Sequence, residues 1–266
     1  MAHIKTIALV GYGNLGKIIA KGIEDKLYES YKIIGIYDKF ALDILSENET
    51  RVDSISELLA LNADIIIEAA TTQTLQQIAL PAMESGSDII ALSSGALADK
   101  IFYDEIDLFA KEHGRKFYVV SGAIGGFDIM QAAAFFGEVE ASITTVKSPA
   151  SLEGAPFLEG KTLSQTESEL IFTGNTIEAI EAFPKNVNVS VAMSLATECF
   201  DKAMVKVISD PLATSNVHTI ELANDLVNAT IQVNAQPSKE NKRSSALAAY
   251  SVLAKLKNLA SGISLC

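Results

Sequence analysis

The chain has 266 residues, of which 48% are hydrophobic and 20% are charged, and its formal net charge at neutral pH is −12. A chain of this length and hydrophobicity can bury the core of one large domain or of two ordinary ones. The excess of acidic side chains repels phosphate backbones and anionic lipid surfaces, so we expect neither a nucleic acid nor a membrane as partner.

The sequence predicts neither export nor metal binding. No apolar run reaches the roughly 18 to 20 residues of a membrane span, and the N-terminus leads into an apolar segment without a signal-peptide cleavage site. Cys199 and Cys266 lie far apart and lack the spacing of metal ligands. We therefore expect a cytoplasmic protein with reduced thiols and no bound metal.

The first motif with a chemical meaning is GYGNLG at residues 11–16, which follows an apolar segment and opens a helical pattern. This order of strand, glycines and helix is typical of a dinucleotide-binding βαβ unit. The first glycine permits a tight turn, the second lets the backbone approach a pyrophosphate, and the third allows close helix packing. The residues predicted to contact a cofactor here are Gly11, Gly13, Asn14, Leu15 and Gly16.

An acidic residue follows the second predicted strand, as the same motif requires. Asp38 directly follows the segment YKIIGIY and lies 22 residues past Gly16, close to the roughly 20 expected for the acid that binds the adenosine ribose. A carboxylate there repels a 2′-phosphate and favours NAD, although the adjacent Lys39 offers a cation and leaves NADP open. The structural alternative is a glycine-rich turn with a surface aspartate.

Strand-like and helix-like segments alternate up to about residue 121, which predicts an α/β domain with a doubly wound parallel (Rossmann) sheet over residues 1–121. The predicted strands span residues 7–10, 31–37, 63–69, 88–92 and 116–120, and the predicted helices span 54–61, 74–85 and 99–113. In such sheets the ligand lies beyond the carboxyl ends of the strands, which adds Ala70 to the predicted cofactor contacts.

Residues 122–239 predict a second, α+β domain. Alternating segments such as ATIQVNA favour an antiparallel sheet with one face covered. The predicted strands span 141–146, 169–173, 204–209, 217–222 and 229–233, and the predicted helices span 176–183 and 189–200. An amphipathic helix at 244–259, within the C-terminal segment 240–266, is predicted to pack back on the first domain.

Two segments between these elements are candidates for cofactor contacts. SGAIGGFD at residues 121–128 carries three glycines directly after the last strand of the first domain, where backbone can approach a ligand closely. A flexible interdomain hinge is the alternative. Asn188 stands at the start of a predicted helix, where a helix N-cap is an equally good reading from the residues alone.

One of the three histidines is the best candidate for proton transfer. His218 follows a turn between two predicted strands, whereas His3 precedes the first strand and His113 ends a helix. Histidine suits general-base catalysis because its ordinary pKa lies near neutrality, but a buried structural histidine is equally compatible with the residues. Lys147 and Asn216 are the predicted substrate contacts, with a solvated lysine at a strand end as the alternative for Lys147.

Taken together, these segments resemble the L-aspartate dehydrogenase family. The resemblance rests on GYGNLG, SSGALAD (93–99), SGAIGGFD (121–128), FPKNVNVS (183–190), SDPLATSNVH (209–218) and SALAAYSVLAKLKNL (245–259). It implies a homodimer that oxidises L-aspartate to iminoaspartate with NAD or NADP, for NAD synthesis or for hydrolysis to oxaloacetate and ammonia. It also implies that the catalytic histidine is His218 and that Ala123 and Asn188 contact the cofactor.

The chain departs from the family pattern at two places. The usual Lys-Pro-Pro-Lys-Ser-Leu reads KSPASL at residues 147–152, and the usual Asn-Pro-Lys/Arg-Thr reads NKRS at 241–244. Three alternatives stay open at this point: another reductase of the same architecture, such as a homoserine dehydrogenase or a dihydrodipicolinate reductase, a non-catalytic NAD-binding sensor, and a purely structural protein.

Overall fold

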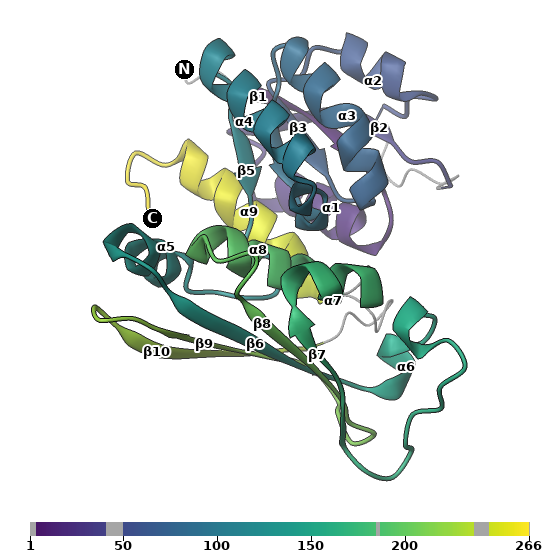
Figure 1. Cartoon of the computed structure of the whole chain (residues 1–266). Helices are drawn as coiled ribbons and strands as arrows, with labels where there is room; N and C mark the ends of the chain where they lie inside the picture. The colour runs from purple at the N-terminus through teal and green to yellow at the C-terminus, as the bar shows by residue number, and fades with distance from the viewer. Residues whose placement is uncertain (1–3, 41–49, 185–186, 237–244, 266) are drawn as a thin grey trace. The chain divides into compact units, whose positions relative to one another are not determined.

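The computed structural model describes residues 4–40, 50–184, 187–236 and 245–265 (Figure 1). The chain divides into two compact units, Met1–Val120 with Ala248–Leu265, and Ser121–Leu247. The boundary after Val120 lies one residue from the predicted one, and the catalytic and dimerisation roles of the second unit stay predictions. His3, Cys266 and the NKRS segment at 241–244 lie outside the described residues.

The first unit is built on a five-stranded sheet in the order β2-β1-β3-β4-β5, and every pairing in it is parallel. Its strands are β1 (Lys5–Val10), β2 (Tyr31–Tyr37), β3 (Ile65–Glu68), β4 (Asp88–Ala91) and β5 (Phe117–Val119). The isoleucines of β3 are at most 1% exposed, because helices cover both faces of the sheet. The predicted doubly wound α/β sheet is confirmed.

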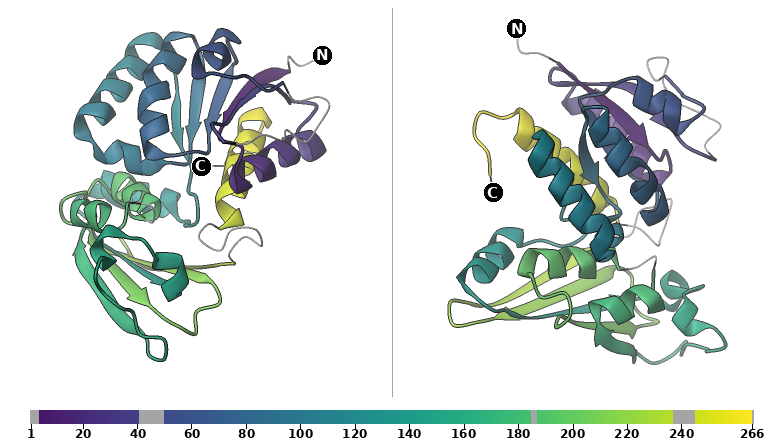
Figure 2. Two further views of the ribbon diagram at one scale, coloured as in Figure 1. Left: turned by 90° about the vertical axis from the view of Figure 1, so that its right-hand side faces the viewer. Right: turned by 45° about the horizontal axis from the view of Figure 1, so that its top comes forward.

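The helices of this unit form two layers around the sheet (Figure 2). They are α1 (Asn14–Lys26), α2 (Ile55–Ala60), α3 (Thr72–Glu84), the 3₁₀ helix η1 (Ser94–Ala98), α4 (Lys100–His113) and α9 (Ala246–Ala260). α1 and α9 share one face, and α2, α3 and α4 share the other. Right-handed crossovers place α1 on one face and α2, α3 and α4 on the other, since the chain reverses direction along the sheet after β2.

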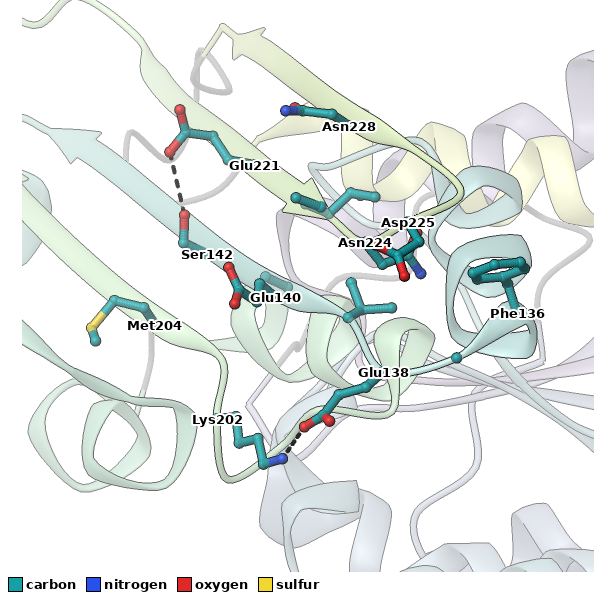
Figure 3. A pocket seen from close by; sticks show the side chains of 15 residues that line it. Phe136, Glu138, Glu140, Ser142, Lys202, Met204, Glu221, Asn224, Asp225 and Asn228 are labelled. Carbon is teal, nitrogen blue, oxygen red and sulfur yellow. Dashed lines mark hydrogen bonds and ion pairs between the residues drawn. The ribbon is translucent and has the colours of Figure 1, made fainter.

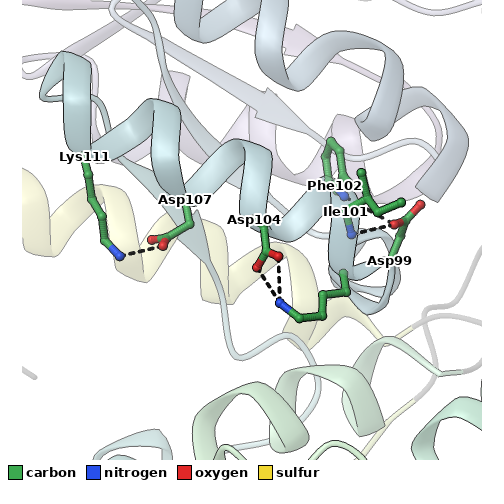
Figure 4. Close-up of polar contacts among 7 residues, drawn as sticks. Asp99, Ile101, Phe102, Asp104, Asp107 and Lys111 are labelled. Carbon is green, nitrogen blue, oxygen red and sulfur yellow. Dashed lines mark hydrogen bonds and ion pairs between the residues drawn. The ribbon is translucent and has the colours of Figure 1, made fainter.

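Local sequence signals set both ends of α4, and Figure 4 shows the cap at its N-terminus. Asp99 caps its N-terminus by accepting hydrogen bonds from the backbone N–H groups of Ile101 at 3.0 Å and Phe102 at 3.3 Å. Gly114 ends the helix in the left-handed conformation, with a φ of 63°. The exposed pair of Lys100 and Asp104, four residues apart, adds a few tenths of a kcal/mol.

The closing helix α9 packs on the first unit, as the amphipathic pattern predicts. Leu253 and Leu256 join the same buried cluster as Ile19 and Ile23 of α1. The Tyr31 hydroxyl donates a hydrogen bond to the carbonyl of Leu256 at 2.9 Å. These contacts tie the end of the chain to its beginning through a shared hydrophobic core.

The second unit holds a five-stranded sheet in the order β10-β9-β6-β8-β7. Its strands are β6 (Glu140–Lys147), β7 (Glu169–Asn175), β8 (Met204–Ser209), β9 (Asn216–Ala223) and β10 (Asn228–Ala235), and its helices are α5 (Phe127–Phe136), α6 (Pro149–Leu152), η2 (Pro156–Leu158), α7 (Thr176–Ala182) and α8 (Asn188–Thr197). Helices α5, α7 and α8 lie over one face of this sheet (Figure 1).

The prediction of an antiparallel sheet is wrong for one pair of strands, since β6 and β8 run parallel over six residue pairs. The chain reverses twice between them, through β7 and then through α7 and α8, so β8 enters the sheet in the same direction as β6. An alternating sequence shows which face of a strand is buried but carries no information on the direction of its neighbour.

Two further local expectations need correction. Helix α5 was not expected, because its sequence FDIMQAAAFF is apolar around almost the whole helix and has no amphipathic period. Asn188 is not the N-cap of α8: Val187 holds that position, and Asn188 is the first helical residue. None of the helices in the described part of the chain has the length and apolar character that crossing a membrane requires.

Candidate active site

The glycine loop between β1 and α1 has the geometry of a pyrophosphate site. Gly11 has a φ of 96°, and a Cβ atom on Gly16 would stand 2.1 Å from the Gly11 carbonyl oxygen. A Cβ atom on Gly13 would meet nothing within 4 Å. The first turn of α1 has no side-chain cap and no acidic residue. Its positive end therefore suits an anion, and the loop fits the phosphates of a dinucleotide.

Asp38 lies beside this loop, as predicted. Its Oδ2 accepts a hydrogen bond from the backbone N–H of Tyr12 at 2.6 Å, and its Oδ1 accepts one from Phe40 at 2.7 Å. Ala70 also borders the glycine loop, since a Cβ atom on Gly11 would stand 2.9 Å from the Ala70 nitrogen. The first unit thus brings the glycine loop, Asp38 and Ala70 together at the carboxyl ends of its strands.

A buried carboxylate at the end of β3 was missed from the sequence. Glu68 is fully buried, and it accepts hydrogen bonds from Ala70 N at 2.7 Å, Ser93 N at 3.0 Å and Ser93 Oγ at 2.8 Å. Burial raises the pKa of the Glu68 carboxyl, against the lowering effect of these hydrogen bonds. Glu68 therefore joins the loops that follow β3 and β4. The available signal was one acid closing the otherwise apolar strand IIIE.

In the second unit, polar side chains gather at one end of the helix-covered face of the sheet. Thr145 of β6 lies opposite His218 of β9 in the strand register, and Lys147 of β6 lies opposite Ser209 of β8. Asn216 begins β9, two residues before His218 and on the same face. All five side chains are buried, and we call them the polar cluster: Thr145, Lys147, Ser209, Asn216 and His218. The fold thus brings together the three residues that the sequence predicts for catalysis and substrate binding.

His218 is held neutral by its surroundings. The residue is 3% exposed, and its Nδ1 lies 3.0 Å from Thr145 Oγ1. Burial, and to a smaller extent the neighbouring Lys147 ammonium, together lower the pKa of His218 to about 3. His218 Nε2 makes no hydrogen bond to any described residue. It keeps some solvent-accessible surface, whereas Ser209 Oγ has none. The ring therefore has one atom left to meet a ligand.

Lys147 is a buried cation in the same cluster. It is 5% exposed, and burial lowers its pKa to about 8. Ser209 Oγ, its register neighbour, is the fully buried side-chain polar atom that lacks a hydrogen-bond partner among the described residues. A buried amine beside an unsatisfied hydroxyl costs stability, and groups of this kind concentrate at functional sites.

Replacement of Lys147 by Met is expected to flatten the pH dependence of stability. Since the folded-state pKa of about 8 lies below the ordinary 10.5, the unfolded chain holds more protons between these values, and the free energy of unfolding of the wild type rises with pH there. The rise amounts to roughly 3 kcal/mol between pH 8 and 10.5. Urea unfolding at both pH values measures it.

Lys206→Met is the matched control for this experiment, since Lys206 lies on β8 with its side chain on the opposite face of the same sheet. The control is expected to keep the wild-type pH dependence. An equal rise in wild type and in Lys147→Met would show that Lys147 keeps its proton in the folded protein over this range.

Ala123 and Asn188 both belong to the second unit. Ala123 lies in the loop before α5, where Ile124 N donates a hydrogen bond to Ser121 O at 3.1 Å. Gly126 in this loop has a φ of 80°, and a Cβ atom on it would stand 2.2 Å from Ile231. Backbone conformation and packing therefore account for the glycine at position 126 without a ligand. The cofactor contacts of Ala123 and Asn188 stay predictions.

A separate cavity of about 980 Å³ lies at the other end of the second sheet (Figure 3). It is lined by residues around Glu138, Ser142, Glu221 and Asn224, and the Lys202 ammonium pairs with Glu138 at its edge. No predicted site residue lines it. Strand β6 contributes residues 140–142 to the lining of the cavity and residues 145 and 147 to the polar cluster, so the two sites share no residue of this strand.

These features define a class of protein. The first unit has a doubly wound sheet with a glycine loop and an acid at the end of a strand. The second unit of the same chain buries a histidine and a lysine. This is the arrangement of an NAD(P)-dependent oxidoreductase. The model of the homoserine dehydrogenase NAD-binding domain matches residues 11–120, and the model of the aspartate dehydrogenase C-terminal domain matches residues 128–259. The chain belongs to the L-aspartate dehydrogenase family, because a protein of that name is 35% identical to it over 95% of this chain.

Individual relatives agree with this assignment over the whole chain. The L-aspartate dehydrogenase of Methanosarcina acetivorans is 35% identical over 260 residues, 95% of this chain and 96% of its own length. That of Methanocaldococcus jannaschii is 34% identical over 260 residues, 96% of each. The crystal structure of aspartate dehydrogenase from Thermotoga maritima has a TM-score of 0.78 and 27% identity, and the match covers 99% of this chain and 100% of that one.

The predicted family, fold class, enzyme class and nicotinamide cofactor are therefore confirmed, and NAD(P)-dependent oxidation of L-aspartate is the activity for which the family is named. A small-molecule substrate follows from the same relatives. The roles of the individual site residues stay predictions.

Proposed function

We propose that this protein oxidises L-aspartate to iminoaspartate with NAD⁺, and that its polar cluster on β6 and β9 contacts the substrate. The observation that supports this function best is the burial of Lys147, Asn216 and His218 on one face of the second sheet. Burying such groups is costly, and the cost is offset when a polar ligand completes their interactions. A dicarboxylic amino acid offers both charges and hydrogen-bond acceptors.

The cofactor is assigned to the first unit. The pyrophosphate would lie on Gly13 and the start of α1 with Asn14 and Leu15, and the adenosine ribose would bind Asp38. Ala70 would contact the cofactor beyond β3, and the remaining contacts fall on Ala123 and Asn188. When bound, the nicotinamide ring supplies the acceptor for the hydride that leaves Cα of the substrate.

The chain's own side chains then bind and orient the substrate. His218 is assigned as the catalytic residue and contacts the substrate through Nε2, and Lys147 and Asn216 hold the remainder of the molecule. Orientation is the main contribution here, since hydride transfer requires the reacting atoms at about 3 to 3.5 Å. The buried floor of the cluster also excludes water, which strengthens each polar contact.

Asp38 is proposed to set the preference for NAD over NADP, because its carboxylate repels a 2′-phosphate. Asp38→Ser is expected to raise KM for NAD about tenfold and to lower the ratio of kcat/KM with NAD to kcat/KM with NADP. Initial rates with both cofactors measure this. Asp53→Ser, at an exposed acid outside the glycine loop, is the control. An unchanged ratio would remove Asp38 from cofactor selection.

The activity is tested by following NADH formation with L-aspartate, D-aspartate, homoserine and glutamate at alkaline pH. Turnover restricted to L-aspartate is expected. Oxidation of homoserine would favour the other reductases of this architecture. Cofactor binding without turnover of any amino acid would favour the NAD-binding sensor.

We also propose the fate of the product, the oligomeric state and the cellular location of the protein. Iminoaspartate would enter NAD synthesis or hydrolyse to oxaloacetate and ammonia, and the protein would act as a homodimer in the cytoplasm. The family resemblance supports the dimer and the route. Sedimentation of the purified protein at several concentrations tests the dimer.

A further inference from the structure

The hydrogen bond between Thr145 and His218 decides which nitrogen of the imidazole carries the proton. The two residues face each other across β6 and β9, and their side chains are 5% and 3% exposed. With the pKa of His218 lowered to about 3, the ring is neutral at physiological pH and carries a single N–H group. Two tautomers are then possible, and they offer opposite groups to a ligand.

The hydroxyl of Thr145 distinguishes the two tautomers. Its contact with His218 Nδ1 at 3.0 Å is the one hydrogen bond that Thr145 Oγ1 makes with the described residues. If Nδ1 carried the proton, it would donate to Oγ1, and the buried O–H of Thr145 would lack an acceptor. A buried donor without an acceptor is more costly than a buried acceptor with a lone pair to spare. The O–H of Thr145 therefore donates to Nδ1.

The proton of the imidazole then lies on Nε2, the nitrogen that makes no hydrogen bond within the described chain and keeps accessible surface. An N–H donor at this position recognises an oxygen, such as a carboxylate of the substrate, and it has no lone pair for an ammonium proton. This assignment differs from the general-base role that the sequence predicts for His218.

We propose that Thr145 is a positioning residue that holds His218 in the neutral tautomer with its proton on Nε2, so that His218 donates a hydrogen bond to a substrate carboxylate. The proposal rests on the function proposed above, because it takes L-aspartate as the ligand. Thr145 then has a role in the reaction, although a threonine within a β-strand gives no sign of one in the sequence.

The tautomer is measured directly by ¹⁵N NMR of the wild-type protein labelled on histidine. The chain has three histidines, and the spectrum of His218→Gln identifies the signals of His218 by their loss. The expected spectrum shows a protonated Nε2 and an unprotonated Nδ1 for His218. A protonated Nδ1 would overturn the proposal. Since this experiment needs no turnover, its result stands apart from the test of aspartate oxidation.

Variants of Thr145 test the link to the reaction. Thr145→Val removes the hydroxyl at nearly constant shape and is expected to lower kcat at least about tenfold with KM for NAD unchanged. Thr145→Ser keeps the donor and is expected to stay within about threefold of wild type. Thr144→Val, on the opposite face of the same strand, controls for the loss of a threonine from β6.

Thr145→Val with the wild-type tautomer and wild-type kcat would overturn the positioning role. A variant of His218 separates the two chemical roles further: Gln carries an amide donor near the position of Nε2 but is not a base. We expect His218→Gln to keep at least about ten times the kcat of His218→Ala, and equal loss in both would restore the general-base role.

Discussion

Replacement of Gly13 by Ala is expected to leave the fold intact and to weaken binding of NAD(H) at least about tenfold. The backbone of Gly13 has a φ of −71°, which alanine adopts freely, and its Cβ atom would meet nothing within 4 Å. The free energy of unfolding should therefore change by less than about 0.5 kcal/mol. The methyl group would instead occupy the space in which the pyrophosphate approaches the loop.

Fluorescence titration with NADH measures the loss of affinity, and thermal unfolding measures the stability. Gly16→Ala is the contrasting variant, because its Cβ atom would stand 2.1 Å from a backbone carbonyl and must displace the loop. That variant is expected to lose about 3 kcal/mol of stability. Unimpaired NADH binding by Gly13→Ala would show that the loop does not hold the pyrophosphate.

Replacement of His218 by Ala is expected to lower kcat for L-aspartate at least about 100-fold while NAD still binds. The variant removes the ring atom that meets the substrate, and with it the orientation of Cα for loss of hydride. The cofactor contacts in the first unit are untouched, so the dissociation constant of NADH should stay at its wild-type value.

His113→Ala is the matched control, since this exposed histidine ends α4 in the first unit. Because His218 is buried, its removal also leaves a cavity and an unsatisfied Thr145 hydroxyl, which should cost about 1 to 3 kcal/mol. Thermal unfolding of the variant shows whether the protein is folded at the assay temperature. Turnover close to wild type in a folded His218→Ala protein would remove His218 from the mechanism.

The fold of the first unit was predictable because its signals are local. The glycine motif, the apolar strand at Ile65–Glu68 and the glycine at 114 that ends α4 each depend on a few neighbouring residues, and the alternation of strands and helices leaves few topologies. Helix α5 and the parallel pairing of β6 with β8 were not predictable. The first has no amphipathic period, and the second depends on where a distant strand enters the sheet.

The residues of the candidate site were likewise predictable where their sequence signals are local, and not otherwise. Asp38 follows from local signals, since the acid that binds the ribose ends the second strand roughly 20 residues after the glycine motif of such a βαβ unit. Position in the chain favoured His218 over the two other histidines. Its assignment as the catalyst needed the family resemblance, because the residues themselves left catalyst and structural histidine equally open. Glu68 was missed, as a single acid in an apolar strand gives no sign of the three hydrogen bonds that it accepts.

The sequence by itself determined that this protein binds a nicotinamide dinucleotide on a doubly wound sheet and belongs with the L-aspartate dehydrogenases. Only the tertiary structure decided the state of the polar cluster. Thr145, Lys147, Ser209 and His218 are up to 73 residues apart in the chain, and strand register brings them onto one buried face. The shifted pKa values and the position of the imidazole proton arise from desolvation and from cross-strand contacts, which no sequence spacing encodes.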